Sequence, residues 1–371
     1  MARLKMGVIG CGAIAQIMHL PHLRQLDELY EIYALCDASA KVLDAVGEHY
    51  HVKRLHTAYP DLLAEGIDAV LVLTPGSHAA PALAALKAGV HVLVEKPMCF
   101  TLREADQMID AADQGRRTLM VGYMKRYDPG YRYAQAALPD LGDLSYIQIN
   151  TLHPVEAPFL EIHPLVRNGD IPGPVLAQMA AEKRRLAEEA LGPISEWVQS
   201  IYTEVLLGSL VHDINALRGL VGEPEAVEFA KIWPDGERLP IVTIVLRHGA
   251  GCRTVYTWAS LPDLHDYFEE IALMSARGRI RVQFPSPYLR NFPTPVVVER
   301  MEGQAAFKKY VTASYAEAFR EELIHFHACV AGAQKPLTDG RDARADIEIL
   351  QQVVAAWDPV GLGGEAAAGR G

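Results

Sequence analysis

Short apolar runs alternate with amphipathic stretches along the first 123 residues. The runs typical of buried strands are Leu4–Ile9, Glu31–Cys36, Ala69–Leu73, Val92–Val94 and Leu119–Gly122. Helical periodicity separates them, most clearly over His78–Ala88 and Leu102–Ala112. Strands alternating with helices predict a parallel sheet covered on both faces and joined by right-handed crossovers. We therefore expect an α/β domain with a doubly wound parallel sheet over residues 1–125.

The pattern changes after about residue 144. Strand-like runs now follow one another with few helices between them: Leu144–Leu152, Val227–Trp233, Ile241–Arg247, Thr254–Trp258, Tyr267–Met274, Arg279–Phe284 and Val296–Arg300. This succession predicts an open, mainly antiparallel sheet in an α+β domain over residues 126–358. The segment Gly173–Gly222 is mainly helical, and apolar residues from Tyr315 to Val330 mark an amphipathic helix. Residues 359–371 are expected to form a flexible tail.

Composition narrows the possible partners. The formal net charge is -11, and the basic cluster Lys183-Arg184-Arg185 is followed by Glu188 and Glu189 at helical spacing, which predicts a solvated face and no nucleic-acid partner. The five cysteines are scattered without CxxC spacing, as in a reducing compartment. No apolar run approaches the length of a membrane span. We expect a cytoplasmic protein with a small-molecule substrate, no membrane partner and no metal.

A glycine-rich turn follows the first apolar run. Tight glycines between a strand and a helix let the helix amides face a pyrophosphate. Asp37 ends the next strand-like run, where a carboxylate accepts hydrogen bonds from ribose hydroxyls and repels a 2′-phosphate. The pattern predicts NAD as cofactor, contacted by Gly10, Gly12, Ala13, Ile14 and Asp37. Alternatively, Asp37 only caps the helix that begins near Ser39.

Two later strand ends also carry candidate residues. After Ala69–Leu73, a Pro-Gly turn lets the backbone pass close beneath a ligand. We assign it the cofactor contacts Thr74, Pro75, Ser77 and His78, although a turn without a ligand is the alternative. Glu95-Lys96-Pro97 ends another strand. Lys96 beside a cationic nicotinamide is a plausible acid or base, with Glu95 as a further cofactor contact, unless the two form only a structural pair.

The segment Gly122–Pro129 closes the last strand of the first domain. Its basic and aromatic residues suit an anionic or hydroxylated ligand, so we assign Arg126 to the cofactor and Tyr123 to the substrate. A salt-bridged linker is the alternative. Further on, Leu206, Leu210, Ile214 and Leu217 form the buried stripe of a helix on which His212 falls on another face. A structural histidine is the simpler interpretation, but Gly208 one turn earlier leaves room for a ligand.

These motifs together resemble the glucose–fructose oxidoreductase/inositol dehydrogenase/rhizopine catabolism (Gfo/Idh/MocA) family. They are GxGxxA with the strand-end Asp37, Thr-Pro-x-x-His at 74–78, Glu-Lys-Pro at 95–97, Gly-Tyr-x-Lys-Arg-Tyr-Asp-Pro at 122–129 and Val-His-Asp-Ile at 211–214. The resemblance implies a Rossmann domain, a second domain whose open sheet forms a homodimer or homotetramer interface, and Lys96 and His212 as catalytic residues.

The resemblance also implies an activity. That activity is NAD(H)-dependent hydride transfer between nicotinamide and a secondary alcohol or ketone of a sugar, cyclitol or related compound. The alternatives are NAD-dependent glycoside cleavage without net redox change and a non-catalytic NAD-binding regulator. One departure stands out, because the family often has an acid four residues before the histidine, where this chain has Gly208. Either the substrate differs from the usual polyol, or Glu204, Asp213 or Tyr123 supplies the missing group at the substrate.

Overall fold

The computed structural model describes residues 3–235 and 238–357. Six strands form the first sheet: β1 (Leu4–Ile9), β2 (Tyr30–Cys36), β3 (Leu55–His56), β4 (Ala69–Val72), β5 (His91–Glu95) and β6 (Leu119–Gly122). They are all parallel, in the order β3-β2-β1-β4-β5-β6. The order reverses between β1 and β4, which is the point where a doubly wound sheet opens a crevice at its carboxyl edge. The expected Rossmann fold is therefore confirmed.

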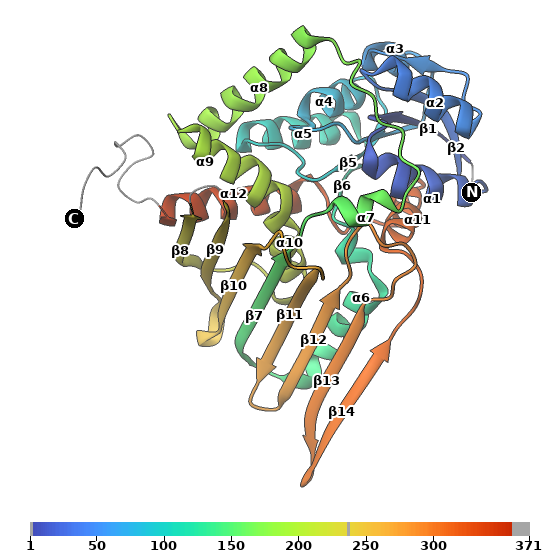
Figure 1. Cartoon of the computed structure of the whole chain (residues 1–371). Helices are drawn as coiled ribbons and strands as arrows, with labels where there is room; N and C mark the ends of the chain where they lie inside the picture. Colours follow the sequence, from blue (N-terminus) through green and yellow to red (C-terminus); the bar gives the residue numbers. More distant parts are fainter. Residues whose placement is uncertain (1–2, 236–237, 358–371) are drawn as a thin grey trace.

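The helices of this domain lie on both faces of the sheet (Figure 1). They are the π-helical turn η1 (Ala15–His19), α1 (Leu20–Gln25), α2 (Ala40–Tyr50), α3 (Tyr59–Leu63), α4 (Ala79–Lys87) and α5 (Leu102–Gly115). Two of these helices, α2 and α5, have side-chain caps at their starts. The Ser39 side chain accepts the Val42 amide at α2, and Thr101 with Glu104 forms a capping box at α5. These caps fix the starts of the helices that follow β2 and β5.

The second domain is built on an eight-stranded sheet. Its strands are β7 (Leu144–His153), β8 (Ala226–Asp235), β9 (Arg238–Arg247), β10 (Arg253–Ser260), β11 (Phe268–Ser275), β12 (Gly278–Phe284), β13 (Pro295–Glu302) and β14 (Ala305–Thr312). The order is β14-β13-β12-β11-β7-β10-β9-β8, antiparallel except for the parallel pair β7–β10. This confirms the expected mainly antiparallel sheet. The strand β14 was not anticipated, because Lys308 and Lys309 interrupt its apolar pattern.

The remaining helices connect or cover the two sheets. They are η2 (Met124–Tyr127), α6 (Pro129–Ala137), η3 (Leu138–Leu141), α7 (Ala157–Glu161), α8 (Gly173–Leu191), α9 (Glu196–Ser200), η4 (Ile201–Leu210), α10 (Val211–Val221), the short turn η5 (Gly249–Gly251), α11 (Ala318–Val330) and α12 (Gly340–Trp357). The helix α11 packs against the first domain, where Leu323 and Phe326 join the core beside β1. Tyr315, expected on this helix, precedes it and is exposed. The expected tail, 359–371, lies outside the described residues.

A second, longer π-helical segment occurs before α10, and sequence periodicity did not indicate it. Residues Ile201–Leu210 form a π-helix that continues directly into α10. The expected stripe of Leu206, Leu210, Ile214 and Leu217 is nevertheless fully buried. π-Helical turns are rare and frequently occur at functional sites. This one brings the end of η4 and the start of α10 to the junction between the two domains (Figure 1).

Candidate functional site

The glycine turn at the end of β1 forms a close approach between two strands. Gly10 has φ +100°, and a Cβ there would lie 2.7 Å from the Leu73 carbonyl, so a side chain is excluded on two grounds. A Cβ at Gly12 would instead meet nothing within 4 Å, because that residue faces an open groove. The turn thus provides backbone amides beside empty space, as a bound pyrophosphate requires.

Asp37 lies at the neighbouring strand end and is held from two sides. Its carboxylate accepts the Cys11 amide at 2.7 Å and the Ser39 amide at 2.8 Å. It therefore joins the glycine turn to the start of α2, and it also lines a groove of about 600 Å³. These bonds leave lone pairs on both oxygens for a further donor. Asp37 therefore braces the turn and also presents a carboxylate to the groove.

Two adjoining cavities follow the carboxyl edge of the first sheet. The groove of about 600 Å³ is lined by Gly10, Gly12, Ala13, Asp37, Thr74 and Pro75 among the expected cofactor residues. A second cavity of about 420 Å³ is lined by Gly12, Ala13, Ile14, Thr74, Pro75, His78, Glu95, Lys96 and His212. Gly12, Ala13, Thr74 and Pro75 border both. The structure thus brings together most of the residues assigned to the cofactor with both residues assigned to catalysis.

Lys96 reaches from the first domain to the second. Its Nζ donates a hydrogen bond to the Gly208 carbonyl at 2.6 Å. Burial lowers the pKa of its ammonium, while the charges of Glu95 and Glu156 oppose that shift. A lysine with a lowered pKa in a cleft is suited to exchange a proton with a ligand.

The residues around Lys96 are held by buried hydrogen bonds. Glu95 accepts from His19 Nε2 at 2.8 Å and from the Lys96 amide at 3.0 Å. Although burial alone would raise the pKa of Glu95, the hydrogen bond from His19 and the charge of Lys96 lower it. His78 Nδ1 donates to the Pro97 carbonyl at 2.6 Å. Glu95 is therefore a buried anion beside Lys96, kept in place by a histidine that sequence reasoning missed.

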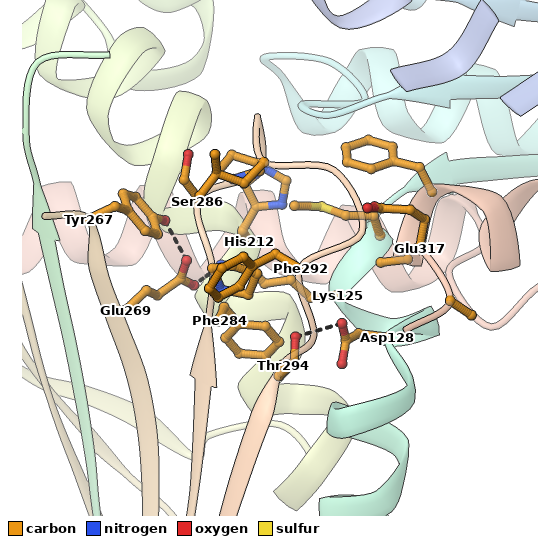
Figure 2. A pocket seen from close by; sticks show the side chains of 17 residues that line it. Lys125, Asp128, His212, Tyr267, Glu269, Phe284, Ser286, Phe292, Thr294 and Glu317 are labelled. Atoms are coloured by element: carbon orange, nitrogen blue, oxygen red, sulfur yellow. Dashed lines mark hydrogen bonds and ion pairs between the residues drawn. The ribbon is translucent and has the colours of Figure 1, made fainter. Parts of the chain in front are cut away.

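His212 faces both the cavity with Lys96 and a smaller one in the second domain. The smaller cavity, of about 60 Å³, is also lined by Lys125, Tyr267 and Glu269 (Figure 2). Burial lowers the pKa of His212 well below its usual value, and the charges of Lys96 and Lys125 add to the effect. Its buried Nδ1 contacts no hydrogen-bond partner within the described part of the chain. His212 thus lines both cavities as a neutral imidazole, and its buried Nδ1 has no protein partner among the described residues.

Gly208 lies one turn before His212, where the family often has an acid. A Cβ on Gly208 would approach only the Thr203 carbonyl oxygen, at 3.5 Å. The backbone at this position is engaged, because its carbonyl accepts Lys96 Nζ. This chain therefore uses a main-chain oxygen to hold the lysine at the helix position that lacks a carboxylate.

The three candidates for the missing group lie elsewhere. Glu204 is exposed and pairs with Lys183 at 2.6 Å, so it is directed to the surface. Asp213 is buried beneath the site and accepts from Tyr256 at 2.5 Å and from Lys125 at 2.8 Å. Tyr123 is buried, with its ring 6.3 Å from that of His212, and its hydroxyl lines neither cavity. Asp213 and Tyr123 thus pack beneath the site, and Glu204 lies at the surface, so none of the three lines either cavity.

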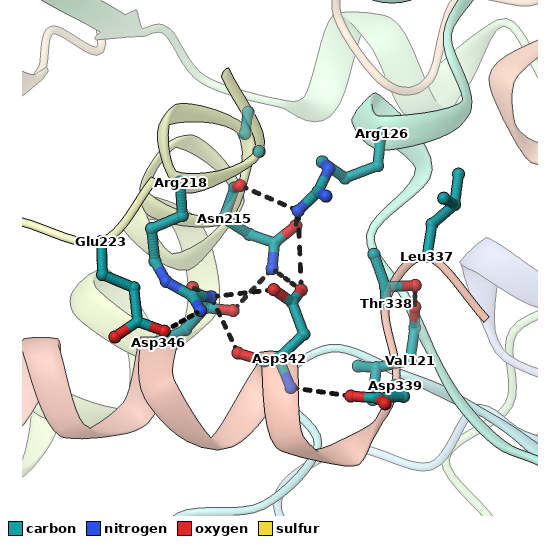
Figure 3. A network of polar contacts seen from close by, with 12 residues as sticks. Val121, Arg126, Asn215, Arg218, Glu223, Leu337, Thr338, Asp339, Asp342 and Asp346 are labelled. Carbon is teal, nitrogen blue, oxygen red and sulfur yellow. Dashed lines mark hydrogen bonds and ion pairs between the residues drawn. The ribbon is translucent and has the colours of Figure 1, made fainter. Parts of the chain in front are cut away.

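Two residues assigned to the cofactor also lie outside the cavities. The Ser77 hydroxyl donates to Glu104 at 2.8 Å at the start of α4. Arg126 contacts the Asn215 carbonyl at 3.3 Å and Asp342 at 3.6 Å, in a polar network that joins η2, α10 and α12 (Figure 3). Arg126 thus takes part in ion pairs and hydrogen bonds of the kind expected for a salt-bridged linker. Lys125 does so as well, with Asp213 and Glu269 as its partners.

A segment of the second domain lines the cofactor groove and was not anticipated. Leu165, Val166, Arg167, Asn168 and Ile171 border the same groove as Asp37. The main chain of Val166 makes two hydrogen bonds with the Gln16 side chain, each 2.9 Å. Contacts between residues 150 apart in sequence have no local signal. No group of three or more His, Cys, Asp or Glu residues placed to hold a metal occurs within residues 3–235 and 238–357.

Comparison with known proteins finds relatives of the first domain. Residues 4–123 match the model of an oxidoreductase family with an NAD-binding Rossmann fold, named GFO_IDH_MocA. The first domain thus matches the model of the Gfo/Idh/MocA family, which the motifs of the chain resemble. Among curated relatives, it is 35% identical to an inositol 2-dehydrogenase/D-chiro-inositol 3-dehydrogenase of Halalkalibacterium halodurans over 37% of this chain. That match spans 40% of the relative's length.

Solved structures resemble the whole chain. One is UDP-N-acetylglucosamine 3-dehydrogenase from Acidithiobacillus ferrooxidans, with a TM-score of 0.73, 21% identity and coverage of 97% of this chain and 99% of that one. Another is a 3-ketoreductase from Actinomadura kijaniata in complex with NADP, with a TM-score of 0.72, 20% identity and coverage of 96% and 98%. At these identities the likeness establishes the fold of both domains. No described helix is long and apolar enough to cross a membrane.

Proposed function

We propose that this protein is an NAD(H)-dependent oxidoreductase that interconverts a secondary alcohol and a ketone of a sugar, cyclitol or related compound. One observation carries the proposal. Lys96 and His212 come from different domains yet line the same cavity of about 420 Å³, directly beside the glycine turn. A proton-exchanging pair next to a dinucleotide groove is the arrangement that alcohol oxidation needs, because the hydroxyl proton and the hydride leave together.

The residues of the groove fit the proposed cofactor. Gly10 excludes a side chain, Gly12 leaves the groove open, and Asp37 has free lone pairs toward it. NAD, when bound, supplies the acceptor for the hydride. The chain positions the substrate and exchanges the proton. Lys96 Nζ takes the hydroxyl proton of the substrate or returns it. His212 accepts a hydrogen bond from that hydroxyl or donates one to the ketone oxygen. The Gly208 carbonyl keeps Lys96 aimed at that position.

The substrate class follows from the chemistry of the second cavity and from the relatives. Beyond His212, a space of about 60 Å³ is lined by the polar residues Tyr267, Glu269 and Ser286 and by apolar side chains such as Phe284 and Phe292 (Figure 2). A mainly apolar wall with a few polar groups suits a ring that carries hydroxyls. The relatives named above act, by their names, on inositols and on a nucleotide sugar. A substrate with a polyhydroxylated ring is consistent with the lining of the cavity and with the names of the relatives.

The direct test is to incubate the protein with NAD and a panel of cyclitols, sugars and hydroxy acids while following absorbance of the reduced cofactor. Reduction of NAD by at least one polyol supports the proposal. Release of free sugar from glycosides without net change in cofactor would favour the glycoside-cleaving alternative. Tight NAD binding without turnover on any compound, in both directions, would favour a regulator.

We expect NAD to bind at least about tenfold more tightly than NADP, because a 2′-phosphate would meet the Asp37 carboxylate at hydrogen-bonding distance. Calorimetric titration of both cofactors measures the ratio. Asp37→Asn should reduce the ratio of the two affinities, chiefly because NADP binds this variant more tightly. Equal affinities in the unaltered protein would show that Asp37 only braces the glycine turn and α2.

We further propose that the second sheet mediates self-association. Large apolar side chains on the adjacent strands β8 and β9 are exposed, namely Phe229, Trp233 and Ile241, and neighbouring exposed apolar side chains often mark an interface. Light scattering coupled to gel filtration should therefore give the mass of a dimer or tetramer. A mass of 40.7 kDa at micromolar concentration would contradict the proposal.

A further inference from the structure

The segment 163–171, which we call the strap, leads from α7 to α8 across the cofactor groove. In Figure 1 its green trace passes the blue helices of the first domain. Three contacts fix it. His163 Nε2 donates to the Tyr288 carbonyl at 2.8 Å, and Val166 makes paired bonds with Gln16. At the far end, Asp170 contacts the start of α2.

The contact of Asp170 uses the donors that a phosphate would need. The Ser39 hydroxyl donates to one oxygen of Asp170, and the Lys41 amide donates to the other at 3.1 Å. Ser39 is also part of the groove wall, next to Asp37. In a Rossmann domain, the carboxylate at the end of β2 binds the ribose, and the start of the next helix is the adjacent source of anion-binding amides. A phosphate ester on the ribose 2′-oxygen would therefore extend toward Ser39 and Lys41.

We propose that Asp170 is a cofactor-specificity residue, which closes the 2′-phosphate position of the groove from the opposite domain. The inference rests on the proposed function, because it assumes that the groove binds a dinucleotide. Asp170 acts in two ways: it occupies both donors, and it places a second carboxylate near Asp37. The hydrogen bond from Ser39 lowers the pKa of Asp170, so this carboxylate carries its charge at neutral pH.

The strap also places a cation, Arg167, in the wall of the groove. Arg167 lines the groove three residues before Asp170, on the same segment. Its guanidinium is suited to hold a phosphate of the cofactor. If Arg167 serves the pyrophosphate, which NAD and NADP share, its removal will weaken both alike. A selective effect on the 2′-phosphate would mean that the strap attracts NADP and does not exclude it.

The test uses two small ligands that differ only at the position in question, 5′-AMP and 2′,5′-ADP, titrated calorimetrically into the full chain. Their affinity ratio cancels any general loosening of the strap. We expect the unaltered protein to prefer 5′-AMP. Asp170→Asn should improve binding of 2′,5′-ADP relative to 5′-AMP at least fivefold, and Asp170→Ala should do so at least as strongly, since alanine frees both donors.

Glu161→Gln is the matched control, because it removes the same charge from the exposed end of α7, and no described contact joins Glu161 to the groove. An equal change in Glu161→Gln would show a general charge effect and overturn the assignment. The assignment would also be overturned if both Asp170 variants kept the affinity ratio of the unaltered protein. The same holds if Arg167→Gln selectively lost affinity for 2′,5′-ADP. If the unaltered protein binds NAD but the ratios do not move, only this inference fails. If it binds neither NAD nor 5′-AMP, the proposed function fails first.

Discussion

Lys96→Met is expected to lower kcat by about 10²- to 10⁴-fold on the substrate that the panel identifies, the usual range for a positioned acid or base. Methionine keeps much of the length and apolar volume of lysine but cannot exchange a proton. NAD affinity should change much less, because the groove beside Asp37 lacks contact with Lys96. Measuring kcat and the Kd of NAD on the same variant separates the two roles. Retained turnover with lost NAD binding would make Lys96 a cofactor contact.

The pH profile of the unaltered enzyme provides a second readout of the same residue. In the direction of alcohol oxidation, only the neutral amine can accept the proton, so activity must rise as the pH passes through the pKa of Lys96. Burial lowers that pKa from its ordinary value of 10.5, so the midpoint of the rising limb should lie below that value. In the direction of ketone reduction the same limb should fall with pH. In Lys96→Arg, residual activity should lose this limb, because the guanidinium stays protonated.

The sequence predicted those parts of the site that depend on local structure. Asp37 and Lys96 follow buried strands, and carboxyl ends of parallel strands must meet at one edge of the sheet. His212 could be assigned to a helix face from spacing alone. The apolar pattern was strong enough in both sheets to predict their architecture, but not β14, whose lysines pair across an edge hairpin.

Contacts between distant segments could not be predicted in this way. Asp170 and Ser39 are 131 residues apart, and Arg126 finds its partners on α10 and α12. A single charged residue has the same appearance in sequence whether it binds a ligand or another side chain. The missing carboxylate at Gly208 illustrates the limit: its position was evident, whereas the role of the Gly208 carbonyl toward Lys96 depends on how the two domains meet.

The largest effect on stability is expected at Lys125, which is buried between two carboxylates. Its Nζ donates to Asp213 at 2.8 Å, and the side chain is only 6% exposed. Nζ also contacts Glu269 (Figure 2). Lys125→Met would leave both anions in the interior without their cation. Removing one partner of a buried ion pair typically costs about 3–5 kcal/mol, because the remaining charge has lost its compensation. We therefore expect a comparable loss in the free energy of unfolding, measured by urea denaturation.

Lys183→Met provides the matched control, since it deletes the same side chain from a pair with Glu204 that is largely exposed. Exposed pairs contribute about 0–1 kcal/mol, so this variant should unfold close to the unaltered midpoint. In the background of Lys125→Met, the additional changes Asp213→Asn and Glu269→Gln should recover part of the loss, because they remove the uncompensated charges while retaining shape. If Lys125→Met unfolds at the same urea concentration as Lys183→Met, the cluster contributes nothing to stability. Lys125 would then be better explained as a substrate-facing cation in the cavity that it shares with His212.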